Sequence, residues 1–162
     1  MELRGAAPFG KKRGFGEEQI TFDGKITSLQ RVSNAYALFF FNGIVEAVEA
    51  YYFSSNDKDL PIYEIENELF TKSLDYVDLQ KEMGVKTPIF LMLTIVGAES
   101  YEILGRKLST GKMNFPPQII TDYEQYSKDQ ATIIKPVFDR LWNAAGFPGS
   151  RSYEKGGQFY LG

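Results

Sequence analysis

The chain contains no cysteine and no histidine among its 162 residues. Without cysteine there is no disulfide bond and no thiol nucleophile. Without histidine the chain lacks the commonest general base near neutral pH, the usual zinc ligand and every Ser-His-Asp triad. Zinc hydrolases, cysteine hydrolases and triad esterases are therefore excluded for this chain alone.

The sequence also lacks a long apolar run. No stretch approaches the roughly 18 apolar residues of a membrane-spanning helix, and no signal peptide opens the chain, so we expect a cytoplasmic protein. The length fits one domain, and 43% apolar and 24% charged residues are ordinary for a globular protein. Aromatic residues, at 15%, are numerous and indicate a core or interface built from rings.

Charge is spread unevenly along the chain. The net charge is −3, but residues 1–16 carry four basic residues against one acid, and residues 46–82 carry ten acids against three lysines. The basic, Gly-rich opening predicts a flexible arm or linker over residues 1–16, followed by a single domain over residues 17–162. A phosphate-binding arm is one interpretation, and a solvated tail is the commoner one. The acidic middle argues against a broad nucleic-acid face.

Two β-hairpins are predicted near the start of the chain. In Gln19–Ser28 two strand-like runs are joined by Asp23-Gly24, and in Asn34–Phe53 two aromatic-rich runs are joined by Asn42-Gly43. Asp-Gly and Asn-Gly pairs favour two-residue type I′ turns. We therefore expect the fold to open with an antiparallel meander.

Two long helices are predicted further along. Apolar residues recur at helical spacing over Ile62–Met83 and over Tyr123–Ala145. Gly84 and Gly146 follow these segments and are typical C-terminal stops. Pro136 lacks an amide hydrogen, so we expect it to kink the second helix or to mark the start of its ordered half.

One segment between the two helices is continuously apolar. Ile89–Val96 has the length of a strand and predicts a central strand covered on both faces. Residues 106–117 predict an exposed loop, and short strands are expected at residues 118–121 and 158–161. These features predict an α+β fold, an antiparallel β-sheet built from hairpins with two main helices packed on one face.

Two glycine-rich segments resemble nucleotide-binding motifs without completing them. Residues 105–112 place five residues between two glycines where a phosphate-binding loop has four, and Met113 replaces the hydroxyl residue that binds magnesium. Gly14-Phe15-Gly16 lacks the third glycine of a dinucleotide fingerprint, and no strand precedes it. Neither segment predicts a nucleotide site.

The acidic residues likewise give no complete site. A metal nuclease needs carboxylates and a lysine on neighbouring strands, and Asp23-Gly24-Lys25 is more simply a hairpin turn. Glu64 and Glu68 lie on one face of the predicted helix, and Glu66 lies on another. Helix capping and solubility therefore explain these three glutamates better than a metal site does. We assign no catalytic residue, no cofactor site and no metal site.

The second hairpin supplies the candidate interface residues, which are Phe39, Phe40, Phe41 and Tyr51. Consecutive strand residues point to opposite faces, so Phe40 is expected to point away from Phe39 and Phe41. The two helices cover one face, and the rings on the other face need another cover. We therefore predict a dimer or partner surface on the sheet face away from the helices. Stacking of bases on these rings is the alternative, but glutamates rather than basic residues frame the strands.

Four blocks of sequence carry a family resemblance. They are RVSNAYALFFFNGIVEAVEA (Arg31–Ala50), LPIYEIENEL (Leu60–Leu69), GVKTPIFLMLTIVGAESYEI (Gly84–Ile103) and IKPVFDRLWNAAGFPGSRSYE (Ile134–Glu154). In order and spacing they resemble the region that follows the Schlafen-type AlbA_2 domain in bacterial proteins described as DNA-binding, transcriptional-regulator or ATP-binding proteins. Phe41 stands where that region has an arginine before its Asn-Gly turn.

This resemblance implies an accessory C-terminal domain that lacks the AlbA_2 domain itself, and it carries over no catalytic residue. Our first hypothesis is a non-catalytic interaction or oligomerisation module, forming a homo-oligomer or binding a protein partner. The second is a direct nucleic-acid-binding module that uses the basic residues Lys11, Lys12, Arg13, Arg31, Arg106, Lys107 and Lys112. A catalytic function comes third and requires a metal bound by carboxylates alone.

Overall fold

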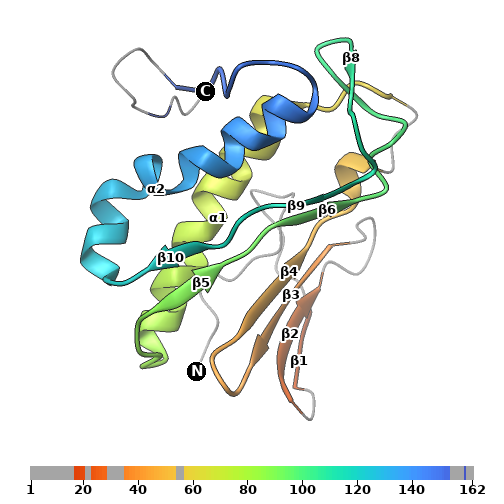
Figure 1. Ribbon diagram of the computed structural model, residues 1–162. Coiled ribbons are helices and arrows are strands. Elements are labelled where there is room, and N and C mark those ends of the chain that lie inside the picture. The colour runs from red at the N-terminus through yellow and green to blue at the C-terminus, as the bar shows by residue number, and fades with distance from the viewer. Residues whose placement is uncertain (1–16, 21–22, 29–34, 54–56, 154–158, 160–162) are drawn as a thin grey trace. The chain divides into compact units, whose positions relative to one another are not determined.

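The computed structural model describes residues 17–20, 23–28, 35–53, 57–153 and 159 (Figure 1). Two helices and several antiparallel strand pairs confirm the α+β class. The chain divides into two compact units, which we describe separately: unit 1 is Met1–Ser54 with Thr71–Lys86, and unit 2 is Ser55–Phe70 with Thr87–Gly162. The single domain expected over residues 17–162 stays a prediction, and the arm expected at residues 1–16 lies outside the described residues.

Unit 1 contains a four-stranded antiparallel sheet whose spatial order follows the sequence (Figure 1). Its strands are β1 (Glu17–Ile20), β2 (Gly24–Ser28), β3 (Tyr36–Phe40) and β4 (Val45–Val48). A short 3₁₀ helix, η1 (Tyr51–Phe53), follows. The expected meander is therefore confirmed.

The turn between β3 and β4 differs from the predicted type I′ turn. The amide of Gly43 donates to the carbonyl of Phe40 at 3.0 Å, and the amide of Phe40 donates to the carbonyl of Ile44 at 2.9 Å. Gly43 has φ 88°, whereas Asn42 keeps a negative φ and accepts the Ile44 amide with its side chain at 3.1 Å. A three-residue loop with its last residue in the left-handed region therefore replaces the two-residue turn.

The turn between β1 and β2 also differs from the expectation. Gly24 does not have the positive φ that a type I′ turn at Asp23-Gly24 requires. Gly24 is instead the first residue of β2 and pairs with Phe40. A Cβ atom at this position would fall directly on the carbonyl oxygen of Phe39, so glycine is required for the close approach of two strands.

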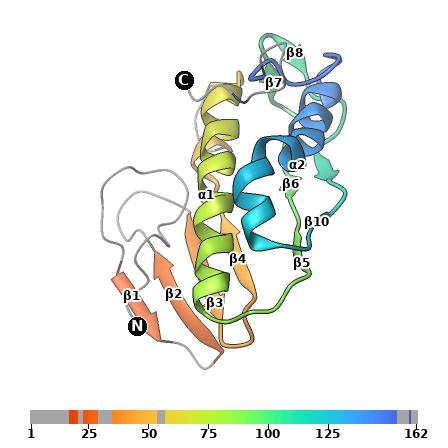
Figure 2. The same cartoon turned by 90° about the vertical axis from the view of Figure 1, so that its left-hand side faces the viewer.

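Helix α1 (Ile62–Glu82) ends one residue earlier than predicted. Gly84, at φ 75°, donates to Lys81, and Val85 donates to Gln80, which together close the helix in a Schellman motif. The second half of α1 belongs to unit 1 and covers its sheet (Figure 2). The core there is apolar: Ala37, Phe39, Tyr76 and Leu79, with Val45, Ala47 and Met83 packed against them.

Unit 2 contains a two-stranded ribbon of residues 89–96 and 112–120. Strand β5 (Ile89–Leu91) pairs with β10 (Gln118–Ile120), and β6 (Thr94–Val96) pairs with β9 (Lys112–Asn114). The expected continuous central strand is thus interrupted and, within the described residues, is paired along one edge only. Pro116 and Pro117 stand where the second strand is interrupted, and neither can donate an amide hydrogen.

The segment expected to be an exposed loop, residues 106–117, also contains strands. Strand β7 (Glu102–Ile103) pairs with β8 (Arg106–Lys107), and β9 belongs to the ribbon. The short strand expected at residues 118–121 is confirmed as β10. In the described part of the chain the strands form four separate sheets. The prediction of one sheet covered by both helices is therefore wrong in the number of sheets.

Helix α2 (Tyr123–Ala144) begins at an N-cap, Asp122, whose side chain accepts the amide of Gln125 at 2.7 Å. Pro136 lies within the helix. Gly146, at φ 76°, ends it in a second Schellman motif. Helix α2 packs against β10, and its buried side includes Tyr126, Phe138 and Trp142.

Candidate functional site

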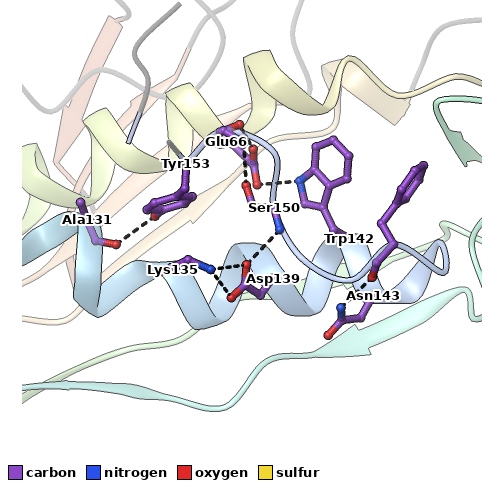
Figure 3. A network of polar contacts seen from close by, with 10 residues as sticks. Glu66, Ala131, Lys135, Asp139, Trp142, Asn143, Ser150 and Tyr153 are labelled. Atoms are coloured by element: carbon purple, nitrogen blue, oxygen red, sulfur yellow. Dashed lines mark hydrogen bonds and ion pairs between the residues drawn. The ribbon is translucent and has the colours of Figure 1, made fainter. Parts of the chain in front are cut away.

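The most deeply buried charged group of the described chain is the carboxyl of Glu66, in the half of α1 that belongs to unit 2. Its side chain is 0% exposed, which contradicts the interpretation that it serves solubility. The indole Nε1 of Trp142 donates to its Oε1 at 2.8 Å, and the hydroxyl of Ser152 donates to its Oε2 (Figure 3). Both carboxyl oxygens therefore have a neutral hydrogen-bond donor.

Burial raises the pKa of the Glu66 carboxyl above its ordinary value. Hydrogen bonds from Ser152, Ser150 and Trp142 lower this pKa, and the charge of Asp139 raises it further. In the described residues no lysine or arginine forms an ion pair with Glu66. Desolvation is the largest of these effects, so the net direction is upward.

Further polar contacts hold the chain that follows α2, residues 146–153, against the helix (Figure 3). Asp139 accepts the amide of Ser150 at 2.9 Å and pairs with Lys135 at 2.6 Å. The hydroxyl of Tyr153 donates to the carbonyl of Ala131 at 3.0 Å, and burial raises the pKa of this phenol. These contacts join residues 150–153 to Glu66 of α1 and to α2.

One face of the ribbon in unit 2 is apolar and exposed. We call it the outer face, and its apolar members are Phe90 (57% exposed), Met92 (70%), Val96 (63%) and Ile119 (57%). Phe90 and Ile119 are direct cross-strand partners. Residues of the opposite face, such as Ile89 and Ile120, are buried. The expectation that this strand is covered on both faces is therefore wrong.

Two arginines meet at one aromatic ring near the end of α2. The guanidinium of Arg106 lies 4.3 Å from the ring centroid of Phe147, and that of Arg151 lies 4.7 Å from the same centroid. Arg106 also donates to the carbonyl of Gly146 at 2.9 Å. Arg151 lies 5.8 Å from the ring centroid of Trp142. Both arginines are exposed, whereas Phe147 is buried.

The candidate interface residues of the second hairpin have different environments. Phe39 is 2% exposed and makes an edge contact with Tyr76 at 6.0 Å between ring centroids, so it belongs to the core. Phe40 is partly buried and Phe41 is 69% exposed. Phe39 and Phe41 do not share an environment because β3 ends at Phe40. The side chain of Tyr51 lies outside the described part.

Of the candidate nucleic-acid contacts, the structure describes only those in unit 2. Arg106 and Lys107 form β8, and Lys112 begins β9; all three are exposed. The remaining candidates lie outside the described residues: Lys11, Lys12, Arg13 and Arg31.

Sequence reasoning did not find Glu66, Arg151 or the outer face. In the sequence Glu66 lies among other glutamates and nothing distinguishes it from them. The one signal for a buried acceptor is Trp142, the single tryptophan, because a buried indole N–H needs a hydrogen-bond partner. Among the described residues there is no group of three or more acidic side chains placed to hold a metal ion. Neither described helix is long and apolar enough to cross a membrane.

Comparison of the chain with family models, curated proteins and solved structures gave no match.

Proposed function

We propose that this chain is a non-catalytic interaction module that self-associates through the outer face. The observation that carries the proposal is the exposure of four apolar side chains on one face of one ribbon. Apolar side chains gathered on an exposed surface are characteristic of interaction sites. Covering each of these half-exposed side chains is worth roughly 1 kcal/mol, about half of the value for full burial.

The occupant proposed for the outer face is a second copy of the chain. Besides its apolar members, the outer face carries three exposed polar residues on the paired strands, which are Thr94, Lys112 and Asn114. Of these, only Lys112 is charged. Two such faces can meet with little like-charge repulsion. A strip with so little charge also offers little to a strongly charged partner.

The resemblance to the region after the AlbA_2 domain gives this module a context. In that context the chain is an accessory domain that assembles a protein linked to nucleic acids or to regulation. Self-association would then bring the attached domains of two chains together, which raises their effective local concentration.

The test compares the oligomeric state of three forms of the full chain by size-exclusion chromatography with light scattering over a range of concentrations. We expect the unmodified chain to dimerise and the double variant Phe90→Ser with Ile119→Thr to remain monomeric with unchanged circular dichroism. Phe41→Ser is the matched control, because it removes an exposed phenylalanine of unit 1. A strictly monomeric unmodified chain, or loss of the dimer in Phe41→Ser alone, would show that the outer face is not the interface.

Direct nucleic-acid binding is the second candidate function, favoured by the exposure of Arg106, Lys107 and Lys112. The test is a salt titration of binding to single- and double-stranded DNA and RNA. Binding through phosphates must weaken as salt rises. No measurable affinity at low salt would eliminate this candidate.

A further inference from the structure

We propose that Arg106 and Arg151 form a binding site for a phosphate monoester group. The site lies wholly within unit 2, between the hairpin β7–β8 and the chain that follows α2. It does not depend on the outer face or on self-association.

The two guanidinium groups are held on the buried ring of Phe147. Stacking on an aromatic ring favours a guanidinium group and leaves its N–H edge free to bind. Arg106 is further fixed by its hydrogen bond to Gly146. The backbone nearby is fixed as well, because the amide of Ser109 donates to the carbonyl of Ala144 at 2.9 Å. Two planar sets of donors are thus placed beside one ring before any ligand arrives.

Neither arginine has a carboxylate partner in the described part of the chain. The ion pairs found there join Lys72 to Asp75 and Lys135 to Asp139. Two positive charges that share one ring repel each other. An anion bridging them would remove this repulsion and form charge-assisted, bidentate hydrogen bonds, which arginine makes with carboxylate and phosphate.

The turn beside Arg106 has an unusual backbone. Leu104 has φ 49°, in the left-handed region, and Gly105 has φ 72°. The side chain of Leu104 is 42% exposed. A two-residue type I′ turn requires a positive φ at both central residues, so the β7–β8 hairpin accounts for this backbone, and the turn leads directly into Arg106.

The charges around the site favour a small ligand over a nucleic acid. Asp59 accepts the amide of Gly105 at 3.4 Å, and Glu102 pairs across the hairpin with Lys107. These carboxylates interrupt the run of positive charge that a polyanion would follow along the surface. A phosphate monoester presents up to two negative charges and three oxygens at one point, which matches two guanidinium groups better than a single carboxylate or one phosphodiester does.

The experiment measures binding of glycerol phosphate to the full chain by titration calorimetry and by the fluorescence of Trp142. Trp142 is the only tryptophan and lies beneath Arg151, so it reports on this site. Inorganic phosphate is titrated in parallel to separate free phosphate from an ester. A single-stranded oligonucleotide without a terminal phosphate separates monoester from diester recognition.

We expect Arg151→Gln to weaken binding at least roughly tenfold, since it removes charge-assisted hydrogen bonds to the phosphate. Arg151→Lys should keep the charge but lose the bidentate geometry and so bind more weakly than the unmodified chain. Arg140→Gln is the matched control, because Arg140 is an exposed arginine of α2 away from Phe147, and it should bind within twofold of the unmodified chain.

Three results would overturn the proposal. They are no binding of either phosphate probe, equal weakening by Arg151→Gln and Arg140→Gln, and tighter binding of the oligonucleotide than of glycerol phosphate. The last result would favour direct nucleic-acid binding. Arg106→Lys provides a second variant that keeps a positive charge near the end of α2, and it should also weaken binding of the monoester. None of these outcomes bears on whether the chain dimerises.

Discussion

Truncating Glu66 to alanine tests whether this buried carboxyl holds unit 2 together. Glu66→Ala removes the acceptors of the Trp142 indole and the Ser152 hydroxyl, which lie in a core without exposed surface. A buried donor left without a partner costs about 1–3 kcal/mol, and the substitution also leaves a cavity. Relief of the buried charge offsets part of this cost. With two neutral donors left unpaired, a cavity, and relief of the buried charge, we expect a net loss of about 2–4 kcal/mol.

Glu66→Gln separates the hydrogen bonds from the charge. The amide oxygen of glutamine can still accept from the indole of Trp142. Its NH₂ group can donate to the oxygen of Ser152, whose hydroxyl is free to rotate. Because both contacts survive and the buried charge disappears, we expect this variant to lose less than about 1.5 kcal/mol at neutral pH.

The assay is equilibrium unfolding in urea, followed by Trp142 fluorescence and by far-ultraviolet circular dichroism. The indole contacts Glu66 directly, so fluorescence reports on unit 2, and circular dichroism reports on the helices. Glu64→Ala is the matched control, because Glu64 is an exposed acid two residues earlier in α1. Because Glu64 lies in the first turn of α1, where an acid stabilises the helix end, we expect this substitution to cost no more than about 1 kcal/mol.

Two results would refute this account of Glu66. If Glu66→Ala is as stable as Glu64→Ala, the carboxyl does not hold its two donors. If Glu66→Gln is as destabilised as Glu66→Ala, the negative charge is required and the hydrogen bonds are not the source of the stability.

Two further predictions concern pH and a close approach of strands. Because the pKa of Glu66 is raised in the folded chain, its contribution to stability is fully present below the unfolded pKa of 4.5 and is lost as pH rises through the folded pKa. Glutamine does not titrate. The unfolding free energy of Glu66→Gln should therefore rise relative to that of the unmodified chain from acid to neutral pH. A constant difference in unfolding free energy across that range would contradict the shift. Gly24→Ala should cost more stability than Gly84→Ala, because a Cβ at Gly24 meets backbone, whereas at Gly84 no atom lies within 4 Å and only the left-handed backbone opposes it. Equal unfolding midpoints for the two variants would show that the β2–β3 approach adjusts freely.

Local signals predicted the regular elements well. Helical periodicity and the stops at Gly84 and Gly146 place both helices to within one residue at each end. Hairpin signals likewise place the meander of unit 1. These features depend on a few neighbouring residues, which is the range over which sequence patterns act.

The turn types and the ribbon were predicted less well. Asn42-Gly43 permits a two-residue and a three-residue loop, and the register between Phe39 and Val45 decides which one forms. Likewise, the apolar run Ile89–Val96 is consistent with a strand covered on one face or on both. Only the identity of its neighbours distinguishes the two, because both faces of the run carry apolar side chains.

The candidate site was least visible in the sequence, because its residues are far apart along the chain. Glu66 meets Trp142 and Ser152 only through the first half of α1, helix α2 and the return of residues 146–153. Arg106 and Arg151, likewise far apart in sequence, both lie against the ring of Phe147. Helix α1 adds to the difficulty, since its first half belongs to unit 2 and its second half to unit 1. A glutamate facing the core of one unit therefore lies on the same helix as Tyr76, which faces the core of the other. One apolar face, averaged over the whole length of the helix, does not describe α1. A buried acid on such a helix is therefore predicted from the sequence to be exposed.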